Sequence, residues 1–128
     1  MAGYVANIEE LTLVNGFFRQ VLFTAKHCQL VLMCLQPQEE IGLEVHDHVD
    51  QFFRFESGQG KVIIDDAEHP VKDGDCVIVP AGSQHNIINL SATEDLKLYT
   101  IYSPANHPDG TIHKTKAEAD AAEAAEHH

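Results

Sequence analysis

Short segments rich in apolar residues, some of them alternating with polar ones, recur along most of the chain with turn signals between them. Segments of this length, rich in Val, Ile, Leu and Phe and bounded by Gly, Pro, Asp or Asn, are typical of β-strands. Many short strands separated by close turns favour an all-β sandwich or barrel. The pattern predicts strands over residues 17–25, 28–35, 42–48, 51–55, 61–64, 69–72, 76–79, 85–90 and 96–102.

The last part of the chain follows a different pattern. Residues 106–110 contain a Pro and a Gly placed for a turn. Thr115 and Glu118 have the spacing of a capping box, and the Ala/Glu-rich run to Glu126 favours a helix. Because this run has few large apolar residues, we expect a short C-terminal helix that lies on the surface.

The chain is divided into parts only by these changes of pattern. We expect N-terminal strands that complete the barrel over residues 1–29, a barrel core over residues 30–102, and a C-terminal loop and helix over residues 103–128. A length of 128 residues suits one domain. His127 and His128 are either native or the remnant of a tag, and the sequence leaves both alternatives open.

Composition excludes several classes of partner. Hydrophobic residues make up 44% of the chain and the formal net charge is −12. A surface this acidic repels phosphate groups, so we expect no nucleic-acid partner and no docking on anionic membranes. The longest purely apolar run, residues 30–35, is far too short to cross a bilayer. The N-terminus has no basic region followed by a long apolar one, which favours a cytoplasmic location.

The cysteines suggest a reducing compartment. Cys28, Cys34 and Cys76 are odd in number, form no C-x-x-C pair and lie within or beside apolar runs. We therefore expect reduced thiols that are buried as small hydrophobic side chains.

Histidines supply the strongest chemical signal. His46 and His48 are one residue apart on a predicted strand, so their side chains are expected to point to the same face. His85 begins a later predicted strand, directly after a Pro-x-Gly corner. Imidazoles that converge from two strands could bind a transition metal, although strand histidines on a solvated face are the simpler alternative. The remaining histidines lie near turns and are expected to be exposed: His27, His69, His107 and His113.

The segment from residue 74 to residue 89 matches a known signature. It fills the pattern G-x5-P-x-G-x2-H-x3-N with Gly74, Pro80, Gly82, His85 and Asn89. This pattern resembles the second signature of the cupin superfamily without a mismatch. The resemblance extends over residues 30–102 and is strongest to the small, single-domain cupin 2 group, which often carries a mannose-6-phosphate-isomerase-like label.

The first cupin signature, G-x5-H-x-H-x3,4-E-x6-G, is matched only in part. His46 and His48 fill the H-x-H, and Gly58 fills the closing glycine. Gln51 stands where the family usually has glutamate, and the gap before it is one residue shorter than usual. Glu40 occupies the position of the opening glycine.

The resemblance implies a cupin jelly-roll β-barrel, a homodimer and a divalent transition metal, namely Ni, Zn, Fe, Mn or Cu. The implied metal ligands are His46, His48, Gln51 and His85. With Gln51 in place of glutamate, these ligands are neutral, so a bound metal would keep its full charge and be more electrophilic. The same substitution leaves a barrel that has lost its metal as an alternative.

Strand alternation predicts the wall of the pocket. If Gln51 points inward, Phe53 and Phe55 do so as well, and Ile87 shares a face with His85. This wall is apolar, whereas a phosphosugar requires cationic groups. The chain's arginines are Arg19 and Arg54, and Arg54 is predicted to face away from Gln51. A small, mostly apolar or enolisable substrate is therefore favoured over a phosphosugar.

The leading functional hypothesis is a metal-dependent enzyme that acts on a small oxygenated organic molecule. Oxygenases, isomerases, lyases and decarboxylases all occur on this scaffold, and the fold does not choose among them. No general base is evident, because alternation turns Asp47 away from its histidine neighbours. The alternatives are a non-enzymatic cupin that binds a small molecule or metal for sensing or storage, and a purely structural barrel.

Overall fold

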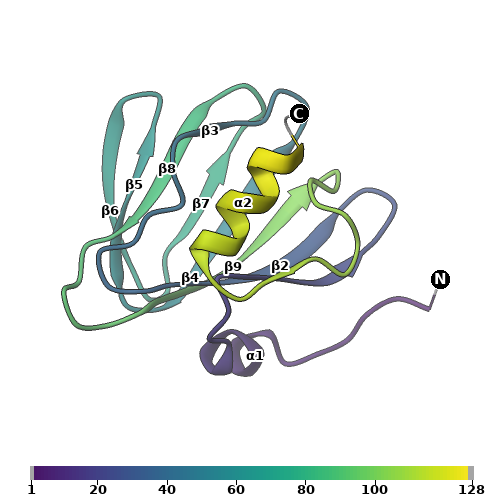
Figure 1. The fold of residues 1–128 in the computed structure, drawn as a ribbon, viewed down its shortest axis with the longest axis horizontal. Coiled ribbons are helices and arrows are strands. Elements are labelled where there is room, and N and C mark those ends of the chain that lie inside the picture. The colour runs from purple at the N-terminus through teal and green to yellow at the C-terminus, as the bar shows by residue number, and fades with distance from the viewer. Residues whose placement is uncertain (1, 127–128) are drawn as a thin grey trace.

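Two antiparallel β-sheets pack face to face in the computed structural model, which describes residues 2–126 (Figure 1). The larger sheet has the strand order β10-β1-β2-β9-β4-β7 and the smaller has the order β3-β8-β5-β6. The larger sheet contains β1 (Arg19–Thr24), β2 (Gln29–Leu35), β4 (Asp50–Ser57), β7 (Cys76–Val79), β9 (Leu96–Ser103) and β10 (Ile112–His113). The smaller contains β3 (Glu44–Val45), β5 (Gln59–Ile64), β6 (Ala67–Lys72) and β8 (Gln84–Asn89). The predicted all-β jelly roll is confirmed.

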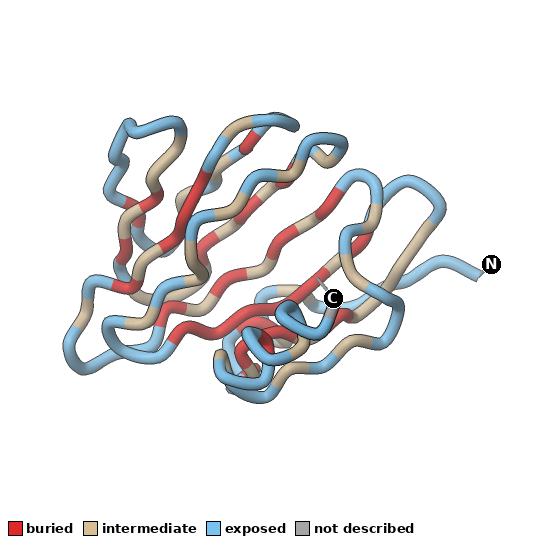
Figure 2. The backbone as a smooth tube through the Cα atoms, turned by 45° about the horizontal axis from the view of Figure 1, so that its top comes forward, coloured by how far each residue is buried: buried red, intermediate tan, exposed pale blue. Residues whose placement is uncertain are grey.

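The core lies between the sheets and follows the alternation predicted for β4. Gln51, Phe53 and Phe55 are buried, whereas Phe52 and Arg54 on the opposite face are partly exposed. Figure 2 shows buried positions on the strands of both sheets and exposed positions in the connecting loops. Each large apolar side chain buried in this way contributes roughly 1.5–3 kcal/mol to the free energy of unfolding. Phe53, Phe55 and Ile87 all belong to this core cluster.

The predicted C-terminal helix is present as α2 (Lys116–Glu126). Thr115 caps it, since its Oγ1 accepts a hydrogen bond of 3.1 Å from the backbone N–H of Glu118. The carboxylate of Glu118 also turns back to the helix start and accepts a 2.6 Å bond from the backbone N–H of Lys114, one residue before the N–H that a capping box uses. The helix lies across the opening between the two sheets (Figure 1) and buries Ala119. His127 and His128 lie outside the described residues.

Helix α1 (Ile8–Val14) precedes β1, in the part of the chain where only strands were expected. Asn7 is its N-cap, and its side-chain oxygen accepts a 3.0 Å hydrogen bond from the backbone N–H of Glu10. The signal for this helix was therefore present, because Asn followed three residues later by Glu before an apolar run marks a helix start. Within the described residues, no helix has the length and apolar character needed to cross a membrane.

The strand predicted over residues 42–48 is reduced to the two residues of β3. After Val45 the chain leaves the sheet, and its polar groups bond to the β7–β8 turn instead. The backbone N–H of Gly82 donates to the carbonyl of His46 at 2.9 Å, and the N–H of Ala81 donates to Asp50 Oδ1 at 2.9 Å. Gly82 has φ +89°, a conformation in which a residue with a Cβ atom is strained.

The prediction of buried cysteines is correct for Cys34 and wrong for the other two. Cys28 lies in the turn before β2, and Cys76 lies on the outer face of the edge strand β7, so both are exposed. Burial raises the pKa of the Cys34 thiol to about 11, so this thiol stays protonated and unreactive at neutral pH.

Candidate metal centre

Three potential metal ligands converge at the opening between the sheets. One ligand atom each from Glu44, His46 and His85 lies within 4.8 Å of the other two. Glu44 and His85 are directly opposite each other in the antiparallel pairing of β3 with β8. Residues opposite each other in such a pair place their side chains on the same face of the sheet. His46 follows two residues after Glu44 and joins the same cluster.

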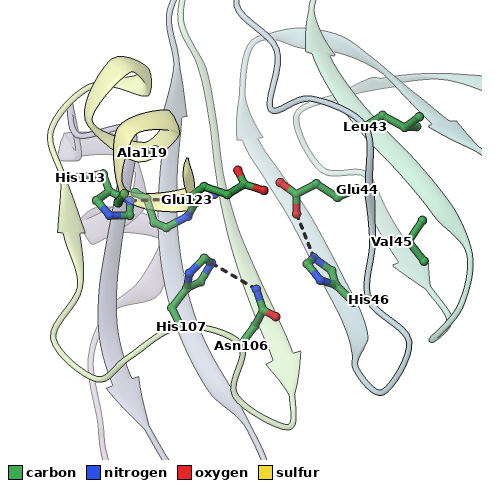
Figure 3. A pocket seen from close by; sticks show the side chains of 11 residues that line it. Leu43, Glu44, Val45, His46, Asn106, His107, His113, Ala119 and Glu123 are labelled. Atoms are coloured by element: carbon green, nitrogen blue, oxygen red, sulfur yellow. Dashed lines mark hydrogen bonds and ion pairs between the residues drawn. The ribbon is translucent and has the colours of Figure 1, made fainter. Parts of the chain in front are cut away.

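His46 and Glu44 make a short ion-pair contact. Nε2 of His46 lies 2.9 Å from Oε2 of Glu44 (Figure 3). This nitrogen is nevertheless buried, and no group among the described residues meets the geometry of a hydrogen-bond partner for it. Two ligands at right angles on one metal, each about 2.0–2.2 Å from it, are about 3 Å apart. The separation therefore fits two neighbouring metal ligands.

His85 is prepared as a neutral metal ligand. Its side chain is buried, and Nδ1 lies 3.2 Å from the backbone carbonyl of Ser83. A carbonyl can only accept, so Nδ1 carries the proton and Nε2 keeps its lone pair. Burial lowers the pKa of His85, which favours the neutral imidazole that a metal requires. The ring centroids of His46 and His85 are 5.4 Å apart.

Glu44 supplies a negative charge to the cluster. Burial alone would raise the pKa of Glu44, but the hydrogen-bonding contact with His46 and the charges of His46, Arg19 and His85 outweigh it. The net effect lowers the pKa, so the carboxylate is ionised at neutral pH. Two imidazoles and a carboxylate are a donor set that suits divalent transition metals such as Zn²⁺ and Fe²⁺.

Gln51 is buried with its side-chain amide held in one orientation. The hydroxyl of Thr100 donates to the carbonyl of Phe52 at 2.8 Å, so its oxygen accepts the 3.0 Å bond from Gln51 Nε2. This arrangement shows which end of the Gln51 amide is the nitrogen Nε2, so the opposite end is the oxygen Oε1. Oε1 is buried and has no hydrogen-bond partner among the described residues. A buried, unpartnered carbonyl-type oxygen is an available ligand for a cation.

The structure does not bring His48 to the cluster. Its side chain is exposed, in the loop that follows β3. The expectation that His46 and His48 share one face of a strand depended on a strand that continues past Val45, and β3 ends there. Two residues that are two positions apart do place their side chains together in the cluster, as the sequence predicted. They are Glu44 and His46, and not His46 and His48.

A pocket of about 330 Å³ opens beside the cluster (Figure 3). Its wall is polar, whereas the sequence predicted an apolar one. Phe53, Phe55 and Ile87 pack in the core and do not line it, although the ring centroid of Phe53 lies 6.2 Å from that of His85. The pocket is lined by Arg19, Leu43, Glu44, Val45, His46, Asn106, His107, His113, Ala119, Ala122 and Glu123.

His107 and His113 were expected to be exposed and instead line this pocket. Burial, with a smaller contribution from the charge of Arg19, lowers the pKa of His107 to about 4. His107 is therefore neutral at pH 7. Its Nε2 lies 3.3 Å from the hydroxyl of Tyr102, which is fully buried and whose pKa burial raises. Tyr102 thus stays protonated and can donate to this nitrogen.

Comparison with known proteins identifies the family. The model of the family described as "Cupin domain" matches residues 31–102, more than half of the chain. The chain is a cupin. Its jelly roll is therefore the cupin fold. The cluster of Glu44, His46 and His85 lies at the opening of this fold.

Similar proteins extend the likeness beyond the core. This cupin is 48% identical over 126 residues to "Uncharacterized protein YrkC" of Bacillus subtilis. The matched region covers 94% of this chain and 67% of YrkC. The crystal structure of BH2720 from Bacillus halodurans is 44% identical, with a TM-score of 0.89 over 92% of this chain and 93% of that one. A predicted oxalate decarboxylase from Thermotoga maritima is 23% identical, with a TM-score of 0.57 over 60% of this chain and 66% of that one, and shows the fold alone.

The geometry also reveals a signal that the sequence reading missed. If Glu44 and His46 fill the two histidine positions of the first cupin signature, the gap to Gln51 is four residues, within the usual range. The opening glycine then falls on Gln38, which has φ +63°. Glycine is the residue that adopts such a positive φ without strain, so the backbone keeps the motif where the side chain has changed.

Proposed function

We propose that this cupin is a metal-dependent enzyme that acts on a small oxygenated organic molecule, with the metal held by Glu44, His46 and His85. The observation that carries the proposal is the convergence of these ligand atoms within 4.8 Å. The tautomer of His85 supports it, because its Nε2 keeps a lone pair for a metal, and the 2.9 Å between His46 Nε2 and Glu44 Oε2 fits two ligands of one ion.

We further propose Oε1 of Gln51 as a fourth protein ligand. Its amide is oriented by Thr100, and its oxygen is buried and lacks a hydrogen-bond partner within residues 2–126. The proposed ligands then include one carboxylate, from Glu44, and not the wholly neutral set considered from the sequence. Gln51 and Glu44 would have exchanged roles relative to the cupin signature, with the carboxylate moved to the H-x-H position.

A divalent metal bound there would polarise a carbonyl oxygen or lower the pKa of a bound water. The residues of the chain would supply the rest. His107 lines the pocket as a neutral imidazole whose Nε2 accepts from the hydroxyl of Tyr102 3.3 Å away, which would hold both groups in place beside a ligand. The packed sheets behind Phe53 keep water from one side of the cluster.

Metal content of the purified protein tests the proposal. The protein would be expressed without a metal-affinity step and analysed by inductively coupled plasma mass spectrometry. We expect about one divalent metal per chain in the wild type and its loss in Glu44→Gln and His46→Ala, because removing one of three ligands weakens binding strongly. The matched control is His48→Ala, which should keep its metal because His48 is exposed outside the cluster.

A wild type that binds no divalent metal, even after titration with Zn²⁺, Ni²⁺, Mn²⁺ and Fe²⁺, would refute the proposal. Equal metal loss in His46→Ala and His48→Ala would refute the assignment of the ligands. The non-enzymatic alternative differs in a second measurement, because it allows tight binding of small molecules by the metal-loaded protein without turnover. The homodimer and the cytoplasmic location stay predictions.

A further inference from the structure

An arginine lines the pocket that two of the proposed metal ligands, Glu44 and His46, also line. Arg19, on β1, is only 7% exposed, yet it contributes to the pocket wall together with Glu44 and His46. A charged side chain buried to this degree requires partners, because removing a guanidinium from water is costly. Sequence reasoning gave Arg19 no role, and no motif includes it.

Neutral groups hold the guanidinium at the pocket. Arg19 and His113 are directly opposite each other in the pairing of β1 with β10, and Nη1 of Arg19 lies 3.2 Å from Nδ1 of His113. A guanidinium can only donate, so Nδ1 of His113 accepts and this histidine is neutral. The guanidinium carbon also lies 5.3 Å from the ring centroid of Phe18, within the range of a cation–π contact.

Part of the guanidinium still has hydrogen-bonding capacity. Its Nε is buried and has no hydrogen-bond partner within the described part of the chain. Buried donors of this kind are rare in folded proteins, and their positions are often completed by a ligand or water. An arginine that offers Nε and a terminal nitrogen presents two parallel N–H groups, which match the two oxygens of a carboxylate.

The charges that line the pocket determine when an anion can bind. With its three histidines counted as neutral, the pocket carries one positive residue, Arg19, and two negative ones, Glu44 and Glu123, which give one net negative formal charge. The carboxylates of Glu44 and Glu123 both point into the pocket (Figure 3). A divalent metal at Glu44 and the two histidines would change this net charge to one positive. An anion is therefore repelled by the metal-free pocket and attracted by the loaded one.

We propose that Arg19 is the binding site for the carboxylate of the substrate, so that this cupin acts on small organic carboxylates. The inference rests on the proposed metal-dependent function. A doubly charged phosphate fits less well, because the pocket offers one arginine and two carboxylates. The volume of about 330 Å³ is at the lower end for ligand sites, which suits a small molecule.

The test compares pyruvate with its neutral analogue, pyruvamide. Both can offer carbonyl oxygens to a metal, but only pyruvate carries a carboxylate. Their dissociation constants would be measured by isothermal titration calorimetry on Zn²⁺-loaded protein. In the wild type we expect pyruvate to bind more tightly, and in Arg19→Met we expect the ratio of the two constants to fall roughly tenfold to hundredfold, as for loss of hydrogen bonds to a charged group.

Two further variants separate the role of Arg19 from general effects. Arg54→Gln removes the same charge from an arginine that is ion-paired with Glu56 outside the pocket, so its ratio should match that of the wild type. Arg19→Lys keeps the charge without the paired N–H groups and should fall between the wild type and Arg19→Met. Circular dichroism and metal content would be measured for each variant, and Arg19→Lys keeps the test valid if Arg19→Met does not fold.

The outcomes distinguish this inference from the proposed function. If Arg19→Met and Arg19→Lys bind metal and keep the wild-type ratio, the carboxylate site is refuted and the metal centre stands. If the wild type binds no metal, the proposed function fails and the carboxylate site fails with it, because the metal-free pocket repels an anion. Metal content therefore tells the two failures apart.

Discussion

The two walls of the pocket are built in different ways. One, the metal wall, comprises β3, the loop after it and β8, and carries Glu44, His46 and His85. The other, the arginine wall, comprises β1, β10 and α2 and carries Arg19, His113 and Glu123. The ligands of the metal wall fall within two short sequence motifs, whereas Arg19 and His113 are 94 residues apart. Motifs therefore locate the first wall, although Glu44 was recognised only from the fold, and only the fold identifies the second wall.

The walls also differ in how their polar atoms are satisfied. On the metal wall, the acceptor Oε1 of Gln51 is buried without a hydrogen-bond partner among the described residues, and Nε2 of His46 lies against the carboxylate of Glu44, which together suit a cation. On the arginine wall, the unpartnered atom is the donor Nε of Arg19, which suits an anion. The contrast indicates a pocket with a cation side and an anion side, and the following predictions test each side separately.

The largest expected effect concerns the support behind the metal wall. Phe53 is 1% exposed and its ring lies beside that of His85. Phe53→Ala should lower the free energy of unfolding by about 3–5 kcal/mol and also weaken metal binding, because the His85 ring loses its packing. Phe55→Ala, equally buried on the same face of β4, is the control, with a similar loss of stability but a smaller loss of metal affinity. Urea unfolding of metal-free protein measures the loss of stability, and competitive metal titration measures the metal affinity. Equal metal affinities of Phe53→Ala and Phe55→Ala would contradict this role of Phe53.

The next effect is on the pH dependence of stability and concerns His107, beside the arginine wall. Burial lowers its pKa to about 4 from an unfolded value near 6.5. Because the folded pKa is the lower one, stability is full above pH 6.5 and is lost as the pH falls toward 4. The shift corresponds to about 3 kcal/mol. Urea unfolding in the presence of a chelator should show a smaller loss between pH 6.5 and 4 for His107→Gln than for the wild type. Parallel pH profiles for the two proteins would rule out this assignment.

The smallest effect tests the connection of the metal wall to the β7–β8 turn. Gly82 and Gly74 have φ angles of +89° and +91°, so an alanine at either position should cost about 1–2 kcal/mol of stability. Only Gly82 donates to the carbonyl of His46. We therefore expect Gly82→Ala to lower metal affinity as well, and Gly74→Ala to leave it unchanged, as measured by competitive titration. The connection would be disproved by a Gly82→Ala protein with the wild-type affinity for metal.

The sequence predicted well the features that depend on neighbouring residues. The alternation of Gln51, Phe53 and Phe55, the cap at Thr115 and the jelly-roll fold all follow from local patterns. The prediction of the metal ligands depended on where a strand ends. Because β3 ends at Val45, the two-residue spacing joined Glu44 to His46 and left His48 exposed. That end is set by hydrogen bonds to residues 81 and 82, more than thirty positions away.

The arginine wall could not be predicted for a related reason. Arg19 reaches the pocket because β1 pairs with β10, a strand of only two residues that the alternation pattern did not reveal. His113 and α2 then surround it. Pairings between short, distant strands leave almost no local signal, since their hydrogen bonds are made between residues with no common periodicity.

Helix α2 closes the pocket with small side chains. Ala119 and Ala122 line it beside the longer Glu123, so part of this side of the cavity is bounded by two methyl groups. A larger residue at position 122, which is only partly exposed, would occupy space now open to a ligand without touching Glu44, His46, His85 or Arg19. The side chains of this helix therefore set the length of ligand that fits, and they can change without changing the metal ligands or Arg19. Relatives with the same metal ligands and arginine could then accept ligands of different lengths.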